Sequence, residues 1–319
     1  MNLQVADQIA KAVLYEGYML YPYRPSSVKN RQRFNFGVLF PAEYCAQQAA
    51  EEACSLRTEC LVSGDTRIEA RLRFLQLQTR PAATGTSSLP DGWQEAVERE
   101  VTLLSESVSH LCQLGVRHSF VFAGEAPGAS EENEFHREGI SGMIEMSAAV
   151  LRPGVFKIVL LVRNTTALQK IPASRDAGLP FALVSTHLIL GSESGSFVSL
   201  LDPPDELREA ADLCQNSGVW PVLVGEPGSR NTLLASPIIL YDYPQIAPES
   251  AGDLFDGTEI DEILSLRIMT LTDEEKNEMR RSGDRAREIL ERTENMPVEQ
   301  FMKLHGAVRG LRPVKEESA

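Results

Sequence analysis

Apolar and polar residues alternate in a series of short runs that fill most of the chain between residues 34 and 241. Runs of this kind, separated by Gly or Pro, are typical of strands that bury one face. The pattern predicts strands at 34–40, 57–62, 66–78, 116–122, 141–151, 155–164, 181–190, 196–201, 220–224 and 232–241. Because a doubly wound parallel sheet would need a helix after nearly every strand, and these are missing, we expect an antiparallel sandwich or barrel.

Two junctions between these runs predict tight turns. Ser63-Gly64-Asp65 joins 57–62 to 66–78, which predicts a hairpin with one face exposed to solvent. Arg71 and Arg73 alternate with apolar residues in the second run, so we expect both arginines to point into solvent. Arg152-Pro153-Gly154 joins 141–151 to 155–164, and the latter run is apolar on both faces, as in a central strand.

Helical patterns lie mainly at the two ends of the chain. Residues 3–13 form an apolar stripe interrupted by Asp7 and Lys11, which predicts an amphipathic helix and not the apolar core of a signal peptide. From residue 252 helix formers dominate, and capping boxes begin at Asp256 and Thr272. Helices are expected at 42–53, 205–216, 257–269, 273–293 and 298–309, while 93–114 carries mixed helical and strand cues.

The fold class that these patterns predict is α+β, with an antiparallel β-rich body and an α-helical C-terminal extension. Loops rich in Gly, Pro, Ser and Thr or in Glu are expected at 80–92 and 123–134. We divide the chain into an N-terminal helix plus β-rich half, a β-sandwich-like half, the helical C-terminal extension and a flexible tail, at 1–135, 136–250, 251–312 and 313–319.

Composition and charge exclude several classes of partner. The 45 acidic and 31 basic residues give a net charge of −14, which disfavours nucleic acid and anionic membranes as partners. No run of eighteen apolar residues occurs, so we expect no membrane insertion and a cytoplasmic protein. The five cysteines include no C-x-x-C pair, and neither a disulfide framework nor a zinc ribbon is indicated.

Sequence signatures of known enzyme classes are missing, among them the Walker A loop, G-x-G-x-x-G, H-E-x-x-H and G-x-S-x-G. No two of the five histidines have the i, i+3 or i, i+4 spacing of a ligand pair on a helix. We therefore assign no catalytic residue, metal site or cofactor. His187, in the run LVSTHLILG, is the histidine with the best prospect of lining a cleft, and its other interpretation is a structural histidine with satisfied hydrogen bonds.

The segment LYPYRPSSVKNRQRFNFG, residues 20–37, concentrates cations and aromatic rings in an acidic chain. Because Pro22 and Pro25 exclude a helix, we expect an extended surface loop. Arg and Tyr are enriched at binding hot spots, so the segment is a candidate docking strip for an acidic partner surface. The alternative is that its cations neutralise the protein's own carboxylates. The residues assigned to partner binding are Tyr21, Tyr23, Arg24, Lys29, Asn30, Arg31 and Arg33.

A second candidate contact region lies at 236–263, where seven carboxylates surround a proline-rich connection. We assign Asp242, Glu249 and Asp253 to partner binding. Such a cluster would also suit a hard cation. The alternative is that Asp256 and Glu259 cap a helix and the other carboxylates are solvated.

Four stretches of the chain resemble a known family: LYEGYMLYPYRPSSVKNRQRFNFGVLFP at 14–41, FVSLLDPPDE at 197–206, 236–276, and LHGAVR at 304–309. The chain is similar there to an accessory protein family encoded in bacterial gene clusters for high-affinity, uptake-type nickel-iron (NiFe) hydrogenases. The resemblance implies a hydrogenase accessory or maturation role, and it carries no assigned reaction or catalytic residue.

The first hypothesis is therefore a non-catalytic accessory or assembly protein that contacts a hydrogenase subunit or a maturation protein through residues 20–33 of the docking strip and the acidic region at 242–262. One alternative is an enzyme, with or without a metal ion, whose pocket uses His187 with Asp202, Asp242 or Glu249. Another is a structural subunit that stays in a larger complex.

Overall fold

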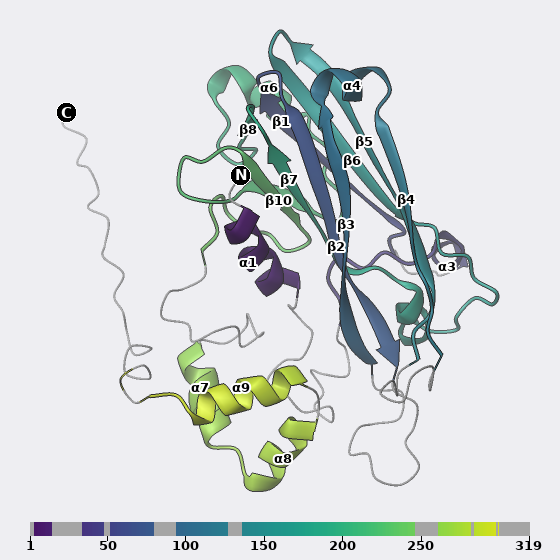
Figure 1. The fold of residues 1–319 in the computed structure, drawn as a ribbon, viewed down its shortest axis with the longest axis vertical. Helices are drawn as coiled ribbons and strands as arrows, with labels where there is room; N and C mark the ends of the chain where they lie inside the picture. The colour runs from purple at the N-terminus through teal and green to yellow at the C-terminus, as the bar shows by residue number, and fades with distance from the viewer. Residues whose placement is uncertain are drawn as a thin grey trace.

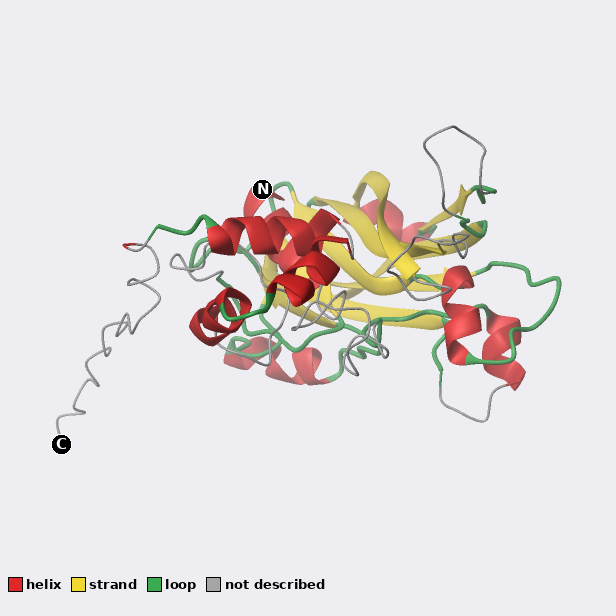
Figure 2. Ribbon diagram, turned by 90° about the horizontal axis from the view of Figure 1, so that it is seen from below, coloured by secondary structure: helices red, strands yellow, loops and turns green. Residues whose placement is uncertain are grey.

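Two five-stranded antiparallel sheets form the body of the protein, as the computed structural model shows (Figure 1). The structure describes residues 3–14, 34–47, 52–79, 94–126, 136–245, 261–281, 284–297 and 299. The first sheet has the order β4-β5-β6-β1-β8 and the second the order β3-β2-β7-β10-β9. The strands are gathered in the middle of the molecule with helices outside them (Figure 2). The α+β class with a β-rich body is confirmed.

The strands of the first sheet are β1 (Ser55–Ser63), β4 (Val116–Phe122), β5 (Ile140–Arg152), β6 (Val155–Asn164) and β8 (Ser196–Val198). Those of the second sheet are β2 (Arg67–Thr79), β3 (Gln94–Ser107), β7 (Val184–Ser192), β9 (Trp220–Leu223) and β10 (Thr232–Ser236). Each sheet combines strands from 1–135 with strands from 136–250, so the two stretches build one sandwich together.

The main core lies between the inner faces of the two sheets. Alternate residues of each strand face it, for example Leu72 and Phe74 of β2 and Ile158 and Leu160 of β6, all of them fully buried. This alternation follows from the two-residue period of a strand. An aromatic cluster closes one part of this core, where the Phe74 ring lies 5.8 Å and 5.7 Å from the rings of Phe120 and Phe122.

The predicted β5–β6 hairpin is confirmed, with Gly154 at a φ of +75° in its turn. β6 lies between β5 and β1, as its apolar character on both faces predicted. The hairpin predicted from Ser63-Gly64-Asp65 is wrong. β1 pairs with β6 and β8, whereas β2 pairs with β3 and β7. The chain crosses from one sheet to the other at this turn, and β1 and β2 contribute apolar residues to the shared core from opposite sheets.

Residues 34–40 do not form the predicted strand. Phe34 and Gly37 have positive φ values of +62° and +54°, which break an extended run, and only Leu39 makes an isolated bridge, to Leu183. The stretch instead packs on the outer face of the second sheet together with α3 (Ala42–Gln47), where Phe34 and Phe40 are buried. The undecided stretch 93–114 contains β3 followed by the helix α4 (Val108–Gln113).

The N-terminal helix α1 (Leu3–Leu14) covers another part of this outer face. Ala6, Ile9 and Ala10 pack against Ile189 of β7 and Leu234 of β10. The predicted amphipathic helix is therefore present, and its apolar stripe is buried against the second sheet.

Short helices connect the later strands: α5 (Arg175–Gly178) and η1 (Leu179–Phe181) precede β7, and η2 (Asp205–Leu207) and α6 (Arg208–Asp212) follow β8. The C-terminal part contains α7 (Asp261–Met269), α8 (Asp273–Arg281) and α9 (Asp284–Glu294). At the start of α8 the backbone amide of Thr272 donates to Glu275 and that of Glu275 to the Thr272 hydroxyl, which confirms this capping box. No helix among the described residues is long and apolar enough to cross a membrane.

Candidate functional site

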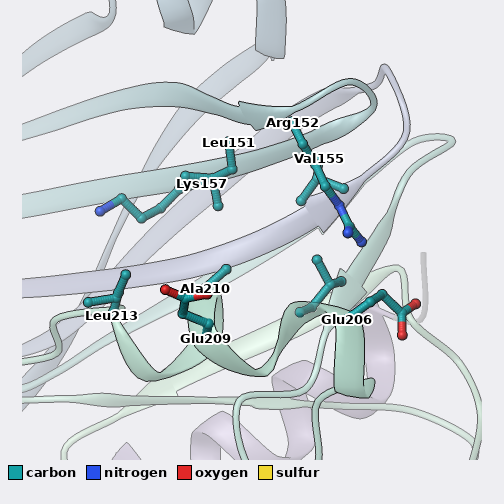
Figure 3. Close-up of a pocket in the computed structure, with 9 residues that line it drawn as sticks. Leu151, Arg152, Val155, Lys157, Glu206, Glu209, Ala210 and Leu213 are labelled. Atoms are coloured by element: carbon teal, nitrogen blue, oxygen red, sulfur yellow. The ribbon is translucent and has the colours of Figure 1, made fainter.

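A cleft of about 240 Å³ opens between the β5–β6 hairpin and the segment formed by η2 and α6 (Figure 3). We call it the hairpin cleft. One wall is made by Leu151, Arg152, Val155 and Lys157 at the end of the hairpin. The other wall is made by Glu206, Leu207, Glu209, Ala210 and Leu213.

The cleft lies on the outer face of the first sheet. Val155 and Leu207 are buried at its base with Leu61 of β1, in a small cluster separate from the main core. Leu151 and Leu213 lie on opposite walls of the cleft and are 42% and 66% exposed. Large apolar side chains that face each other across an open cleft are typical of a binding surface, because a partner that covers them removes apolar area from water.

A buried carboxylate fixes one wall of the cleft. Glu59 of β1 is 1% exposed and accepts hydrogen bonds from Arg57 Nε at 2.9 Å and from the Gln215 backbone amide at 3.0 Å. Lys157 Nζ lies 3.1 Å from Glu59 Oε2, so the Lys157 ammonium is held by Glu59 and its aliphatic stem is left to line the cleft. Burial raises the pKa of the Glu59 carboxyl, but these donors outweigh it and hold the pKa below its usual value.

The charges of the cleft differ between its two walls. Glu206 and Glu209 are exposed on the η2–α6 wall, and Arg152 is exposed on the hairpin wall with its guanidinium pointing toward the Glu206 side (Figure 3). Within the described parts of the chain, none of these three side chains has an ion-pair partner. They are therefore available to a bound molecule.

The apolar surface continues from the cleft along β5 and β6. Ala149, Val159 and Leu161 point outward from the first sheet, because their neighbours Ile158 and Leu160 face the main core. Ala149 is exposed, Val159 and Leu161 are half-buried, and none of the three belongs to a hydrophobic cluster of the described residues. We call these three residues the outer strip.

His187, the histidine singled out from the sequence, lies in β7 and is completely buried. Its Nδ1 donates to the backbone carbonyl of Ser185, a residue held at a positive φ of +49°, and its Nε2 has no hydrogen-bond partner among the described residues. Burial lowers the pKa of His187 to about 3, the hydrogen bond to Ser185 opposes the shift, and Arg73 lowers the pKa further. The imidazole is therefore neutral at pH 7, with an unused lone pair.

Arg73 of β2 is the cross-strand neighbour of His187 and is also buried, at 5% exposure, which corrects the prediction that it points into solvent. It lies on the outward face as expected, but Nη2 lies 3.0 Å from Glu98 Oε2 and Nε lies 3.8 Å from Glu100 Oε2. Its Nη1 has no hydrogen-bond partner in the part of the chain that the structure describes. The carboxylates of β3 thus compensate the charge of the Arg73 guanidinium, which the alternating sequence pattern predicted to be exposed to solvent.

Of the three predicted partners of His187, Glu249 lies outside the described residues, and neither Asp202 nor Asp242 forms a metal site with His187. The Asp242 carboxylate is bound by other residues. It accepts hydrogen bonds from Ser199 Oγ and from the Leu223 backbone amide, the latter at 2.8 Å. Asp202 is exposed in the turn after β8. Among the residues that the structure describes, no three His, Cys, Asp or Glu side chains are grouped so that they could hold a metal ion.

Most of the predicted docking residues lie outside the described residues. Asp242 alone is described, and it ties the stretch after β10 to β9 and to the turn after β8, which is a structural role. The structure describes α1, which precedes the docking strip, and the last residues of the strip itself. The helix α1 contacts β7, and the amides of Ser185 and Thr186 donate to the carbonyls of Phe36 and Gly37. The predicted residues outside the described ranges are Tyr21, Tyr23, Arg24, Lys29, Asn30, Arg31, Arg33, Glu249 and Asp253.

Sequence reasoning missed the hairpin cleft, because its walls are 50 residues apart and meet only in the folded chain. The available signal was a large apolar residue, Leu151, directly before the predicted Arg152-Pro153-Gly154 turn. Comparison of the chain with protein-family models gives no match, and a search of curated proteins gives none.

Proposed function

We propose that the protein is a non-catalytic accessory protein that acts by protein–protein contact, and that its partner is a hydrogenase subunit or a maturation protein. The identity of the partner follows from the family resemblance. The observation that carries the mode of action is the hairpin cleft, where exposed leucines and unpaired charges face each other. Hot spots of protein interfaces combine such apolar anchors with surrounding charged groups.

The geometry of the cleft favours a protein partner over a free small ligand. Its volume of about 240 Å³ lies below the roughly 300–1,000 Å³ of most small-molecule sites. It would hold one large apolar side chain, and the adjoining outer strip supplies further apolar area for the rest of a partner segment.

Capture of purified candidate partners tests this proposal. The tagged chain is mixed, one at a time, with the hydrogenase subunits and with the maturation proteins, and the dissociation constant is measured for the one that binds. Leu213→Gln is expected to weaken binding about tenfold, a loss of about 1.4 kcal/mol, since a wall of the cleft becomes polar.

Leu104→Gln is the matched control. Leu104 is 82% exposed on β3, and it belongs to the second sheet, whereas the cleft lies on the first. The control should bind as the wild type does. Equal losses in the two variants, or no loss in either, would contradict the role of the cleft.

The docking strip is proposed as a second contact of the same partner. Replacing Arg31 and Arg33 together by Glu should weaken capture while the thermal midpoint of unfolding stays within a few degrees of wild type. If the double variant instead loses stability, the strip is an internal support and its proposed contact role is wrong.

A second candidate function is an enzyme that uses His187, with or without a metal ion. It is favoured by one observation, the buried Nε2 lone pair beside the unpartnered Nη1 of Arg73. Metal analysis of the purified chain separates the two functions. A stoichiometric metal that is lost in His187→Ala would support the enzyme, and metal-free protein that still captures its partner would support the accessory role.

A further inference from the structure

We infer that the hairpin cleft and the outer strip bind a basic amphipathic helix of the partner protein. This inference rests on the proposed function and deepens it, because it names the kind of segment that the cleft accepts. It is drawn from the charge of one wall, the spacing of the apolar residues and the length of the surface.

The charge of the η2–α6 wall selects a basic segment. Exposed carboxylates are concentrated there, and Arg208 is the one cation between them, bound to Asp205 at 2.9 Å. On the opposite wall the Lys157 ammonium is held by Glu59, which leaves Arg152 as the cation of that wall without an ion-pair partner among the described residues. Beside the outer strip, Arg57 is paired with Glu59, and Arg163 Nη2 lies 3.8 Å from Glu145 Oε2, so both charges are compensated within the chain. Glu206 and Glu209 line this wall, and the exposed Asp202, Asp205 and Asp212 lie next to it in the same stretch of chain.

The spacing of the apolar residues fits a helix. Outward residues of one strand follow each other at intervals of about 6.6 Å, because a strand rises about 3.3 Å per residue. Val155 and Val159 therefore lie about 13 Å apart, with Lys157 between them, and Val159 and Leu161 lie about 6.6 Å apart. Residues of a helical stripe recur about every 6 Å along the axis, so residues about eight and twelve positions after the one that meets Val155 can meet Val159 and Leu161. Binding of a helix by its apolar face in a groove is a common mode of recognition.

The length of the surface sets the length of the helix. From Val155 to Leu161 the strand advances about 20 Å. A helix of about 13 residues spans the same distance, which is close to four turns. One large side chain near its end would enter the cleft between Leu151 and Leu213, where the volume of about 240 Å³ is available.

Two labelled 16-residue peptides test the inference on the full-length chain by fluorescence anisotropy. Both carry leucines at i, i+4, i+7 and i+11, and the remaining positions are mainly Ala and Lys in one peptide and Ala and Glu in the other. The basic peptide is expected to bind at least tenfold more tightly than the acidic one, and the difference should shrink in high salt. Equal affinities, or no binding of either peptide, would overturn the inference.

Two variants locate the binding. Leu213→Gln should weaken the basic peptide about tenfold, and Glu206→Lys with Glu209→Lys should remove its advantage over the acidic peptide. Leu104→Gln should change nothing, and matching thermal midpoints show that all variants fold. A second copy of the chain in the cleft would appear as a concentration-dependent dimer that Leu213→Gln dissociates, and this result would contradict the inference.

The two proposals fail in different ways. If Leu213→Gln abolishes partner capture but both peptides bind equally well, the accessory function stands and the basic helix is wrong. If the basic peptide binds in the cleft while partner capture is unaffected by Leu213→Gln, the proposed function at this site is wrong.

Discussion

At the residue scale, two buried titratable side chains differ in their charge state at neutral pH. Glu59 stays ionised because Arg57, Lys157 and the Gln215 amide compensate its charge. His187 stays neutral mainly because burial disfavours its charged form, and the guanidinium of Arg73 beside it adds to this effect. Both side chains therefore make the free energy of unfolding depend on pH.

Glu59→Gln is expected to lower the free energy of unfolding by about 1–3 kcal/mol at pH 7, because the charged donors around it lose their acceptor. The folded pKa of Glu59 lies below its unfolded value, so this contribution is complete above about pH 4.5 and is lost as the pH falls through the folded pKa. Urea unfolding of both proteins at several pH values checks this. A difference that is constant down to strongly acidic pH would contradict the ion network.

His187 is expected to make the wild type less stable below about pH 6.5. The unfolded imidazole takes up a proton near pH 6.5, whereas the folded one does so only near 3, so the stability is complete above 6.5 and falls as the pH decreases. Between pH 7 and pH 5 the loss from this residue is about 2 kcal/mol. His187→Leu should lack this part of the pH dependence, and an unchanged dependence in the variant would show that His187 is accessible to protons.

At the element scale, local turn chemistry predicted where strands end but not which strands pair. Arg152-Pro153-Gly154 and Ser63-Gly64-Asp65 carry equally clear turn signals, yet the first makes a hairpin and the second a crossing between sheets. Pairing depends on which apolar faces meet across the core, which involves residues 100 or more positions apart, such as Ser55 and Arg163. The same reason hid the hairpin cleft.

The pairing of β4 with β5 depends on a glycine in the core. Gly142 lies opposite Phe120, and a Cβ at this position would come within 2.2 Å of Phe120 Cζ. Gly142→Ala should therefore displace the ring from the Phe74 and Phe122 cluster and cost about 1–3 kcal/mol in unfolding free energy. Ser147→Ala on the exposed face of β5 is the control, with an expected change within about 0.5 kcal/mol. Equal stabilities of the two variants would contradict this packing.

At the scale of the whole molecule, the sequence predicted the fold class because alternation, turn residues and capping boxes are local signals. The β-rich body, the hairpin at Gly154 and the capping box at Thr272 all followed from them. The candidate site did not, since the exposure of Leu213 and the pairing of Lys157 with Glu59 depend on distant parts of the chain. The buried Arg73 is an error of the same kind, because periodicity assigns a face of the sheet but not what covers it.

Site-specific photo-crosslinking tests most directly whether the hairpin cleft contacts the partner protein. A photoreactive phenylalanine analogue is placed at position 213 or, as the control, at position 104, and the crosslinked product with the captured hydrogenase subunit or maturation protein is sequenced. We predict a crosslink from position 213 to an apolar position within a basic helical segment of the partner, and none from position 104. A crosslink from position 104 alone, or none from position 213 when capture is intact, would contradict the account.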